Sequence, residues 1–336
     1  MYIQRLKQVG LLSLIPTLTH NSRMNEFEMI KQCFAEWPQQ HPNVLQGIGD
    51  DCLVWLDPEP LVVSVDTAVI GRHFPEFSTP EQVACRSFLP AISDLAAMTA
   101  TPAFFTLALT LPGHCNGEWV TRFARQLSEL AEIYDIMLAG GDTTRGEQLT
   151  VTISVHGRCP HPVLRSGAKA GDDVWVTGHL GQAAAGLPFV LAQSEDQAAA
   201  EWLQAYWQPQ PPLTFAAALQ GCIHSAIDLS DGLVGDAGHI AQESQMQLHL
   251  NIDALPMDPQ LTELGEQGLQ YAVSGGDDYQ LLFTADPITR EEISHLAHLH
   301  GVLVTRIGQV RAGHPAIHWY DSGRPVNLPW HSFSHF

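Results

Sequence analysis

Lysine is scarce in this sequence of 336 residues, where it occurs only as Lys7, Lys31 and Lys169. The chain carries 36 acidic against 16 basic residues, and its formal net charge is −20. Such a balance argues against a partner that is a nucleic acid or an anionic membrane, and it suits a protein that concentrates cations. None of the three lysines stands in a GxxxxGK[ST] loop, and the HRD and DFG kinase signatures are absent.

The sequence also lacks paired cysteines. Its six cysteines form no CxxC pair, which excludes the usual zinc-site and disulfide patterns and fits a reduced, cytoplasmic location. Histidine is abundant, but "HLAHLH" at 295–300 is typical of the solvated face of an amphipathic helix. We therefore expect no metal site there.

No apolar run is long enough to cross a bilayer. Residues 1–23 combine a basic start with the apolar "VGLLSLIPTL", but no small-x-small cleavage site follows. We interpret residues 1–23 as a dispensable extension, or as the result of an upstream start codon with Met24 as the working one.

Strand-like and helix-like segments alternate along the first half, and the length of the chain favours two domains. A helix is expected at 79–98, opened by Thr79 and Pro80 and kinked or divided by Pro90. A second helix is expected at 116–134, with Trp119, Phe123, Leu127, Leu130 and Ile133 near one face. The expected strands are 61–67, 103–111 and 148–157.

A segment rich in Pro, Gly and Arg, 158–172, separates the halves, and it predicts domains at 24–158 and 159–336. The second half again mixes both kinds of segment, so the fold class is α/β or α+β with two lobes. Its expected strands are 172–178, 247–252, 279–285 and 302–310. Its expected helices are 180–193, 197–207, 213–221, 233–244 and 289–300.

Six clusters combine a carboxylate with small residues at expected strand or helix ends. They are "GIGDD" (47–51), "SVDT" (64–67), "SDLAAM" (93–98), "GGDTTRG" (140–146), "IDLSDG" (227–232) and "SGGDDYQL" (274–281). Small residues let the backbone approach a ligand closely, and oxygen ligands suit Mg²⁺. Because Mg²⁺ sites often include substrate phosphates, a nucleotide is the expected companion. Arg145 and Arg165, each beside a glycine-rich turn, are best placed to offset phosphate charge.

These motifs resemble, in order and spacing, those of thiamine-monophosphate kinases, and the resemblance covers residues 24–336. That family lies in the superfamily of aminoimidazole ribonucleotide synthetase and selenophosphate synthetase. The resemblance implies a two-domain α/β homodimer whose N-terminal domains pair in a β-barrel-like arrangement, with ATP near the lobe interface. It also implies ATP-dependent phosphorylation of thiamine monophosphate to thiamine diphosphate, with several Mg²⁺ ions, by direct in-line transfer without a general base.

The resemblance assigns a role to each matching position. Asp94, Asp142 and Asp228 would bridge metal ions. The metal ligands would be Asp51, Ser64, Val65, Asp66, Asp94, Asp142, Asp228 and Asp231. The ATP contacts would be Gly141, Asp142, Arg165 and Ser230. The thiamine monophosphate contacts would be His73, Asp277 and Phe333. The resemblance assigns no role to Asp50, which would either cap the turn or orient Asp51.

This chain departs from the family pattern at several of those positions. Val65 replaces a frequent threonine, so that only a backbone carbonyl remains as a ligand. Asp277 replaces the usual glutamate, and Phe333 replaces an aromatic with a polar edge. Pro90 and Ala91 replace valine and asparagine ahead of Asp94. These departures bear on substrate affinity more than on the reaction type.

Two other functions stay open at this stage. A sister enzyme such as selenophosphate synthetase would want a reactive N-terminal cysteine or selenocysteine beside a lysine, which this sequence lacks. A non-catalytic protein that binds Mg²⁺, Ca²⁺ or a nucleotide would bind metal tightly without turnover. An ADP-release assay with thiamine monophosphate and Mg²⁺ separates the three.

Overall fold

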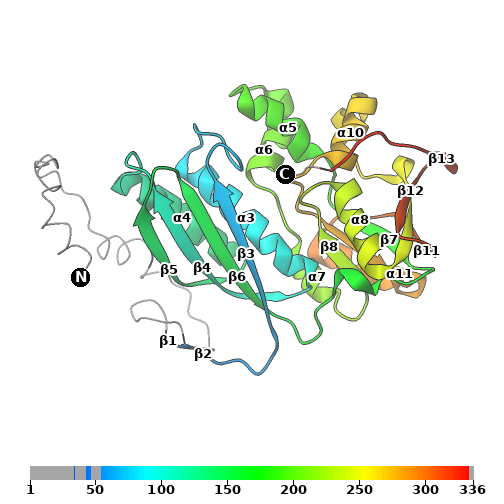
Figure 1. Ribbon diagram of the computed structural model, residues 1–336, viewed down its shortest axis with the longest axis horizontal. Helices are drawn as coiled ribbons and strands as arrows, with labels where there is room; N and C mark the ends of the chain where they lie inside the picture. The colour runs from blue at the N-terminus through cyan, green and yellow to red at the C-terminus, as the bar shows by residue number, and fades with distance from the viewer. Residues whose placement is uncertain (1–33, 35–42, 47–53, 333–336) are drawn as a thin grey trace, which may run out of the picture.

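The computed structural model describes Phe34, residues 43–46 and residues 54–332. The sequence positions Asp50, Asp51 and Phe333 lie outside the described residues. Two lobes stand side by side, each built on its own sheet, with helix α3 between them (Figure 1). Within the described residues, none of the helices combines the length and the apolar character that crossing a bilayer would require.

The first lobe is a four-stranded sheet in the order β3-β6-β4-β5, with two helices on one face. All neighbours are antiparallel except β4 and β5, which are parallel. The strands are β3 (Leu61–Val69), β4 (Thr101–Leu111), β5 (Met137–Arg145) and β6 (Thr150–Arg158). The helices are α3 (Pro80–Ala97) and α4 (Gly117–Ile133), and the short strands β1 (Val44–Gln46) and β2 (Val54–Trp55) pair separately.

Local chemistry explains both helices. Thr79 caps α3 by accepting the Gln82 N–H, Gln82 bonds back to the Thr79 N–H, and Pro80 occupies the first turn. Asn116 caps α4 by accepting the Trp119 N–H at 2.9 Å. The caps confirm the predicted starts of both helices.

Three details of the first lobe differ from the sequence-based expectation. Pro90 does not divide α3, because buried side chains pack around the helix along nearly its whole length. Ile133 is 72% exposed, so it does not belong to the buried face of α4, because that face ends where the helix ends. The "GGDTTR" cluster lies inside strand β5 and is not a turn at its end.

The second lobe is a mixed seven-stranded sheet in the order β13-β12-β9-β11-β7-β10-β8. Its strands are β7 (Asp173–Thr177), β8 (Ser225–Asp228), β9 (Met246–Asn251), β10 (Leu281–Ala285), β11 (Val304–Ala312), β12 (Ala316–Asp321) and β13 (Arg324–Val326). Its helices are α5 (Gln182–Leu191), α6 (Ala200–Trp207), α7 (Leu213–Ala218), α8 (Leu233–Ser244), α9 (Pro259–Glu263), α10 (Glu266–Ser274) and α11 (Arg290–His300). Short 3₁₀ turns are η3 (Arg165–Gly167), η4 (Gln197–Ala199), η5 (Ile252–Ala254) and η6 (Pro287–Thr289). The patterns missed the strands β1, β2, β5, β8, β12 and β13 and the helices α9 and α10, and they placed the other strands and α-helices within a few residues.

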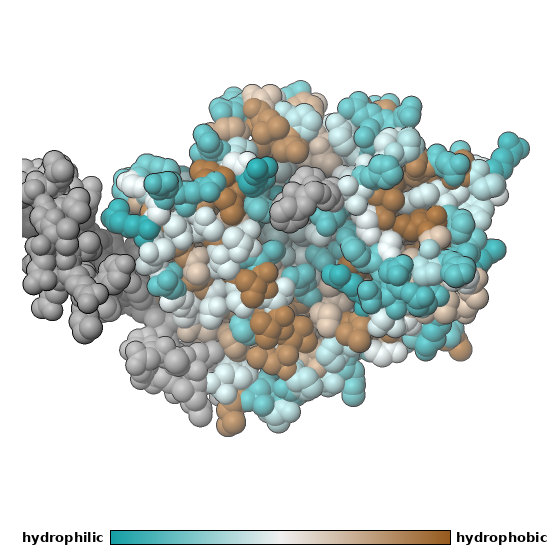
Figure 2. Space-filling view, viewed as in Figure 1, coloured by the Kyte–Doolittle hydropathy of each residue, from teal (hydrophilic) through white to brown (hydrophobic). Residues whose placement is uncertain are grey.

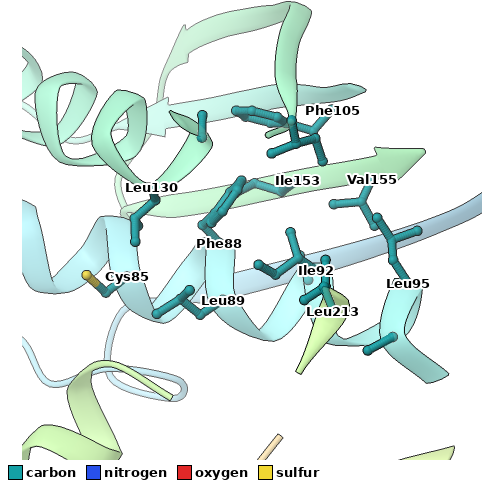
Figure 3. Packing of buried hydrophobic residues seen from close by; sticks show 14 of the residues in the cluster. Cys85, Phe88, Leu89, Ile92, Leu95, Phe105, Leu130, Ile153, Val155 and Leu213 are labelled. Carbon is teal, nitrogen blue, oxygen red and sulfur yellow. The ribbon is translucent and has the colours of Figure 1, made fainter. Parts of the chain in front are cut away.

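Helix α3 joins the two lobes through a shared core. Figure 3 shows its Phe88 and Ile92 close to Ile153 of β6, with Leu213 of α7 nearby from the second lobe. Phe283 of β10 belongs to the same buried cluster. Because α3 is buried on both sides, the side chains that it carries between the lobes are held in place.

The other face of the four-stranded sheet is largely uncovered. On β3, Val63 and Val65 are 51% and 61% exposed, whereas Ala68 on the helix-covered side is buried. Figure 2 shows hydrophobic surface where β3 and β6 lie. Part of this face is covered by Trp55, whose ring lies 4.7 Å from that of Phe104.

Candidate active site at the interface of the lobes

The last turns of α3 bring the two lobes into direct polar contact. Ser64 on β3 donates its hydroxyl to the carboxylate of Asp94 at 2.5 Å. The neighbouring Ser93 donates to the carboxylate of Asp228, at the end of β8, also at 2.5 Å. Two successive residues of α3 therefore contact both lobes, because Asp94 accepts from β3 of the first lobe and Ser93 donates to β8 of the second.

The carboxylates at this point disturb one another. Loss of water raises the pKa of Asp228 to about 7, and the nearby charge of Asp94 adds to the rise. The pKa of Asp66 is raised mainly by neighbouring protein that displaces water and then by the charge of Asp94. The pKa of Asp94 is raised by loss of water, against the lowering effects of the Ser64 hydrogen bond and of the Arg165 charge. Negative charge is thus concentrated here with one arginine to offset it.

The donor set fits a divalent cation. The oxygen ligands of Ser64, Asp66, Asp94 and Asp228 are of the kind that Mg²⁺ prefers, and a cation would relieve their repulsion. Among the described residues, however, no three Asp, Glu, His or Cys side chains converge closely enough to hold an ion unaided. Asp51, which the resemblance adds to this set, lies outside the described residues. The side chain of Val65 points to the uncovered face, so only its carbonyl could contribute.

The turn after β8 is shaped by a carboxylate that the sequence analysis missed. Buried Asp236 of α8 accepts the N–H groups of both Ser230 and Asp231, at 3.1 and 3.2 Å. Gly232 follows with a φ of 101°, a conformation that glycine adopts without strain. The signal was available, because Asp236 falls in the first turn of a helix where a carboxylate accepts free N–H groups.

The segment "SGGDDYQL" lies against that turn. Asp277 donates its N–H to the Ser230 carbonyl at 3.0 Å, and a side chain at Gly276 would collide with the same carbonyl. Asp277 itself has a φ of 70°, unusual for a residue with a side chain. Strain of this kind clusters at functional sites, which is consistent with a role in binding.

The two described positions assigned to thiamine monophosphate lie near each other across the interface. Asp277 forms an ion pair of 2.7 Å with Arg86 of α3, and Arg86 also approaches the backbone carbonyl of His73 at 3.4 Å. His73 belongs to the turn after β3, where its Nδ1 accepts the Val69 N–H at 3.1 Å. Phe333, the third position, lies outside the described residues.

Within one chain, Gly141 and Asp142 do not lie with the carboxylates of Asp66, Asp94 and Asp228. They lie on β5, the edge strand opposite β3, so three strand spacings of about 4.8 Å, or roughly 14 Å, separate Asp142 from β3. In register, Asp142 is level with Ala108, Thr152 and Thr67, a row that faces the uncovered side of the sheet. Asp66 and Ser64 point to the helix-covered side, so Asp142 differs from them in both edge and face.

Two family models match the chain. The N-terminal domain of AIR synthase related proteins matches residues 49–159, and the C-terminal domain of AIR synthase related proteins matches residues 169–320. The helix and strand composition of the two lobes agrees with this two-domain α/β fold.

Individual relatives indicate which family of AIR synthase related proteins the chain resembles. The chain is 40% identical over 321 residues to the thiamine-monophosphate kinase of Escherichia coli (strain K12), covering 93% of this chain and 98% of the relative. The corresponding kinase of Salmonella typhimurium is 39% identical over 320 residues, with the same two shares covered.

Solved structures of thiamine-monophosphate kinases are also similar to this chain. The thiamine-monophosphate kinase of Stenotrophomonas maltophilia K279a is similar with a TM-score of 0.78 and 35% identity, over 85% of this chain and 93% of that chain. A structure described as AaThiL complexed with AMPPCP and TMP has a TM-score of 0.75 and 26% identity, over 95% and 100% of the two chains. The chain therefore belongs to the thiamine-monophosphate kinases, an enzyme family within the AIR synthase-related proteins.

Proposed function

We propose that this protein transfers the γ-phosphoryl group of ATP to the phosphate of thiamine monophosphate, giving thiamine diphosphate and ADP. The observation that carries the proposal is the cluster of Asp66, Asp94 and Asp228 between the lobes, in a chain of this family. A solved relative with an ATP analogue and TMP bound supports the pairing of these two ligands.

The chemistry needs charge compensation more than acid–base catalysis. The attacking atom is a phosphate oxygen of thiamine monophosphate, largely ionised near neutral pH because the second phosphate pKa is about 6. It forms a bond to the γ-phosphorus as the bond to the β-γ bridging oxygen breaks, and ADP leaves with that electron pair. No proton has to be removed by the protein, so no general base is required.

Mg²⁺ would supply charge neutralisation between the two anionic substrates. The residues proposed to hold several such ions are Asp51, Ser64, Val65, Asp66, Asp94, Asp142, Asp228 and Asp231. Arg165, Gly141 and Ser230 would contact ATP. The charge of Arg165 lowers the pKa of Asp94 and of Asp228, which supports its inclusion in the site. His73, Asp277 and Phe333 would contact thiamine monophosphate.

We further propose that the protein acts as a homodimer whose N-terminal sheets meet face to face. The uncovered, partly apolar face of β3 supports this, because burying exposed Val63 and Val65 would be favourable. The placement of Asp142 supports it as well, since Asp142 lies on the uncovered face, which a second copy would cover. The β-barrel-like pairing of the two sheets belongs to the same proposal.

The remaining assignments are proposals too. Residues 24–158 and 159–336 would form the two domains, with residues 1–23 as a dispensable extension. The protein would act in the cytoplasm, with ATP and thiamine monophosphate as partners and neither nucleic acid nor a membrane among them. The charge of −20 supports the last two exclusions.

An ADP-release assay tests the proposed function. Purified protein, ATP, Mg²⁺ and thiamine monophosphate should release ADP and form equimolar thiamine diphosphate, measured by chromatography. Omission of Mg²⁺ should stop the reaction. ADP release with another phosphate acceptor only would favour a sister enzyme, and tight Mg²⁺ binding without any turnover would favour a binding protein.

A further inference from the structure

Arg86 is a buried cation at the centre of the molecule that none of the sequence motifs singled out. Its side chain is 3% exposed on α3, the helix between the lobes. Burying a guanidinium costs folding free energy unless its N–H donors are hydrogen-bonded. The partners of Arg86 therefore indicate its role.

Three separate segments supply those partners. From the turn after β3, the carbonyl of His73 accepts from Nε and Nη2, each at 3.4 Å. From the end of α6, the carbonyl of Tyr206 accepts from Nη1 at 3.1 Å, and the Tyr206 ring lies 4.4 Å below the guanidinium carbon. From the second lobe, Asp277 accepts from Nη2 at 2.7 Å.

The partner carboxylate is held from a second side. Tyr279 donates its hydroxyl to Oδ1 of Asp277 at 2.9 Å, the same oxygen that Arg86 binds. Tyr279 and Asp277 both have positive φ angles, of 49° and 70°. The two contacts therefore fix the direction of a carboxylate whose backbone is already strained.

We propose that Arg86 is a positioning residue that sets the distance between His73 and Asp277 and thereby the affinity for thiamine monophosphate. This inference rests on the proposed function, since both residues are proposed contacts of that substrate. The planar guanidinium reaches acceptors on several segments at once, which the compact ammonium of a lysine cannot reproduce. The residues proposed for ATP are not among its partners, so its effect is confined to one substrate.

Steady-state kinetics with each substrate varied in turn tests the inference. For Arg86→Lys, we expect the KM for thiamine monophosphate to rise about tenfold, the effect of losing one or two hydrogen bonds to charged or buried groups. The KM for ATP should stay within about twofold, because the phosphate-binding residues are not in contact with Arg86. The double variant Arg86→Lys, Asp277→Glu moves the carboxylate toward the shorter cation, and it should recover most of the lost affinity.

The matched control is Arg122→Lys. Arg122 also forms an ion pair between two elements, with both its Nε and Nη2 at 2.8 Å from Glu81, but on the surface of the first lobe. Neither KM should change in this variant. If Arg86→Lys does not fold, as judged by its melting transition, Arg86→Gln is the second variant: its neutral amide can still donate to a backbone carbonyl, and it should show the same split between the two KM values.

The outcomes separate the inference from the proposed function. A wild-type protein without turnover on thiamine monophosphate overturns both. A wild-type protein with turnover, whose Arg86→Lys and Arg86→Gln variants raise the two KM values equally or leave both unchanged, overturns the inference alone. Failure of the double variant to recover affinity would equally contradict a role in setting the distance.

Discussion

Replacing Asp94 by asparagine should abolish turnover while leaving the fold intact. The carboxylate of Asp94 accepts the Ser64 hydroxyl at 2.5 Å, and an asparagine oxygen can accept the same hydrogen bond. What the substitution removes is one negative charge next to Asp66 and Asp228. The change therefore separates the electrostatic role of the residue from its structural one.

Asp94→Asn should raise the stability of the metal-free protein and lower its catalytic rate. Without metal, relief of repulsion should lower the pKa of Asp228 and stabilise the protein by about 1 kcal/mol, since one pKa unit corresponds to about 1.4 kcal/mol. With Mg²⁺ and both substrates, loss of a bridging carboxylate should reduce kcat by roughly 10³-fold or more, or about 4 kcal/mol of the barrier.

Coupled ADP release at saturating substrates gives kcat, and thermal melting without Mg²⁺ gives stability. Asp321→Asn is the matched control, because Asp321 also accepts a serine hydroxyl, from Ser322 at 3.1 Å, but lies exposed on β12. Near-wild-type turnover of Asp94→Asn would refute the metal-bridging role. A lower melting temperature would refute the claim that the charges repel in the metal-free fold.

Three further outcomes are expected. Burial raises the pKa of Asp278 to about 8, so between about pH 4 and pH 8 the folded state binds a proton that the unfolded state has lost. The free energy of unfolding should therefore fall as pH rises through this range, which urea unfolding curves at several pH values measure. Asp278→Asn can still accept the Gly181 N–H, and it should flatten that fall. Val65→Glu should dissociate the proposed dimer, because it introduces a charge on the uncovered sheet face. Light scattering should then report half the mass of the wild-type protein. An unchanged mass would place the interface elsewhere. Deletion of residues 2–23 should leave kcat/KM within about twofold of the full chain, and a larger loss would show that the extension has a role.

Much of the fold could be predicted from local patterns. Thr79 and Pro80 begin α3 as the capping pattern indicates, and β6 alternates buried and half-buried residues as its sequence alternates. Short buried strands such as β8, and strands such as β5 that contain a pair of glycines, carried too weak a pattern to be found. Ile133 was misplaced because helical spacing alone does not show where the neighbouring core ends.

The sequence by itself determined the chemistry: clustered carboxylates with small residues and almost no lysine pointed to metal-assisted phosphoryl transfer, and their order matched one family. Only the tertiary structure decided which of those groups meet. It brought Asp94 and Asp228 together at the end of α3, where Ser64 of β3 binds Asp94 and Ser93 of α3 binds Asp228, and it placed Asp142 on the other edge and face of its sheet. It also revealed Arg86, whose partner Asp277 lies 191 residues away in the sequence. The physical reason is that residue type and spacing determine local geometry, whereas charge repulsion, burial and positioning depend on which segments the fold brings into contact.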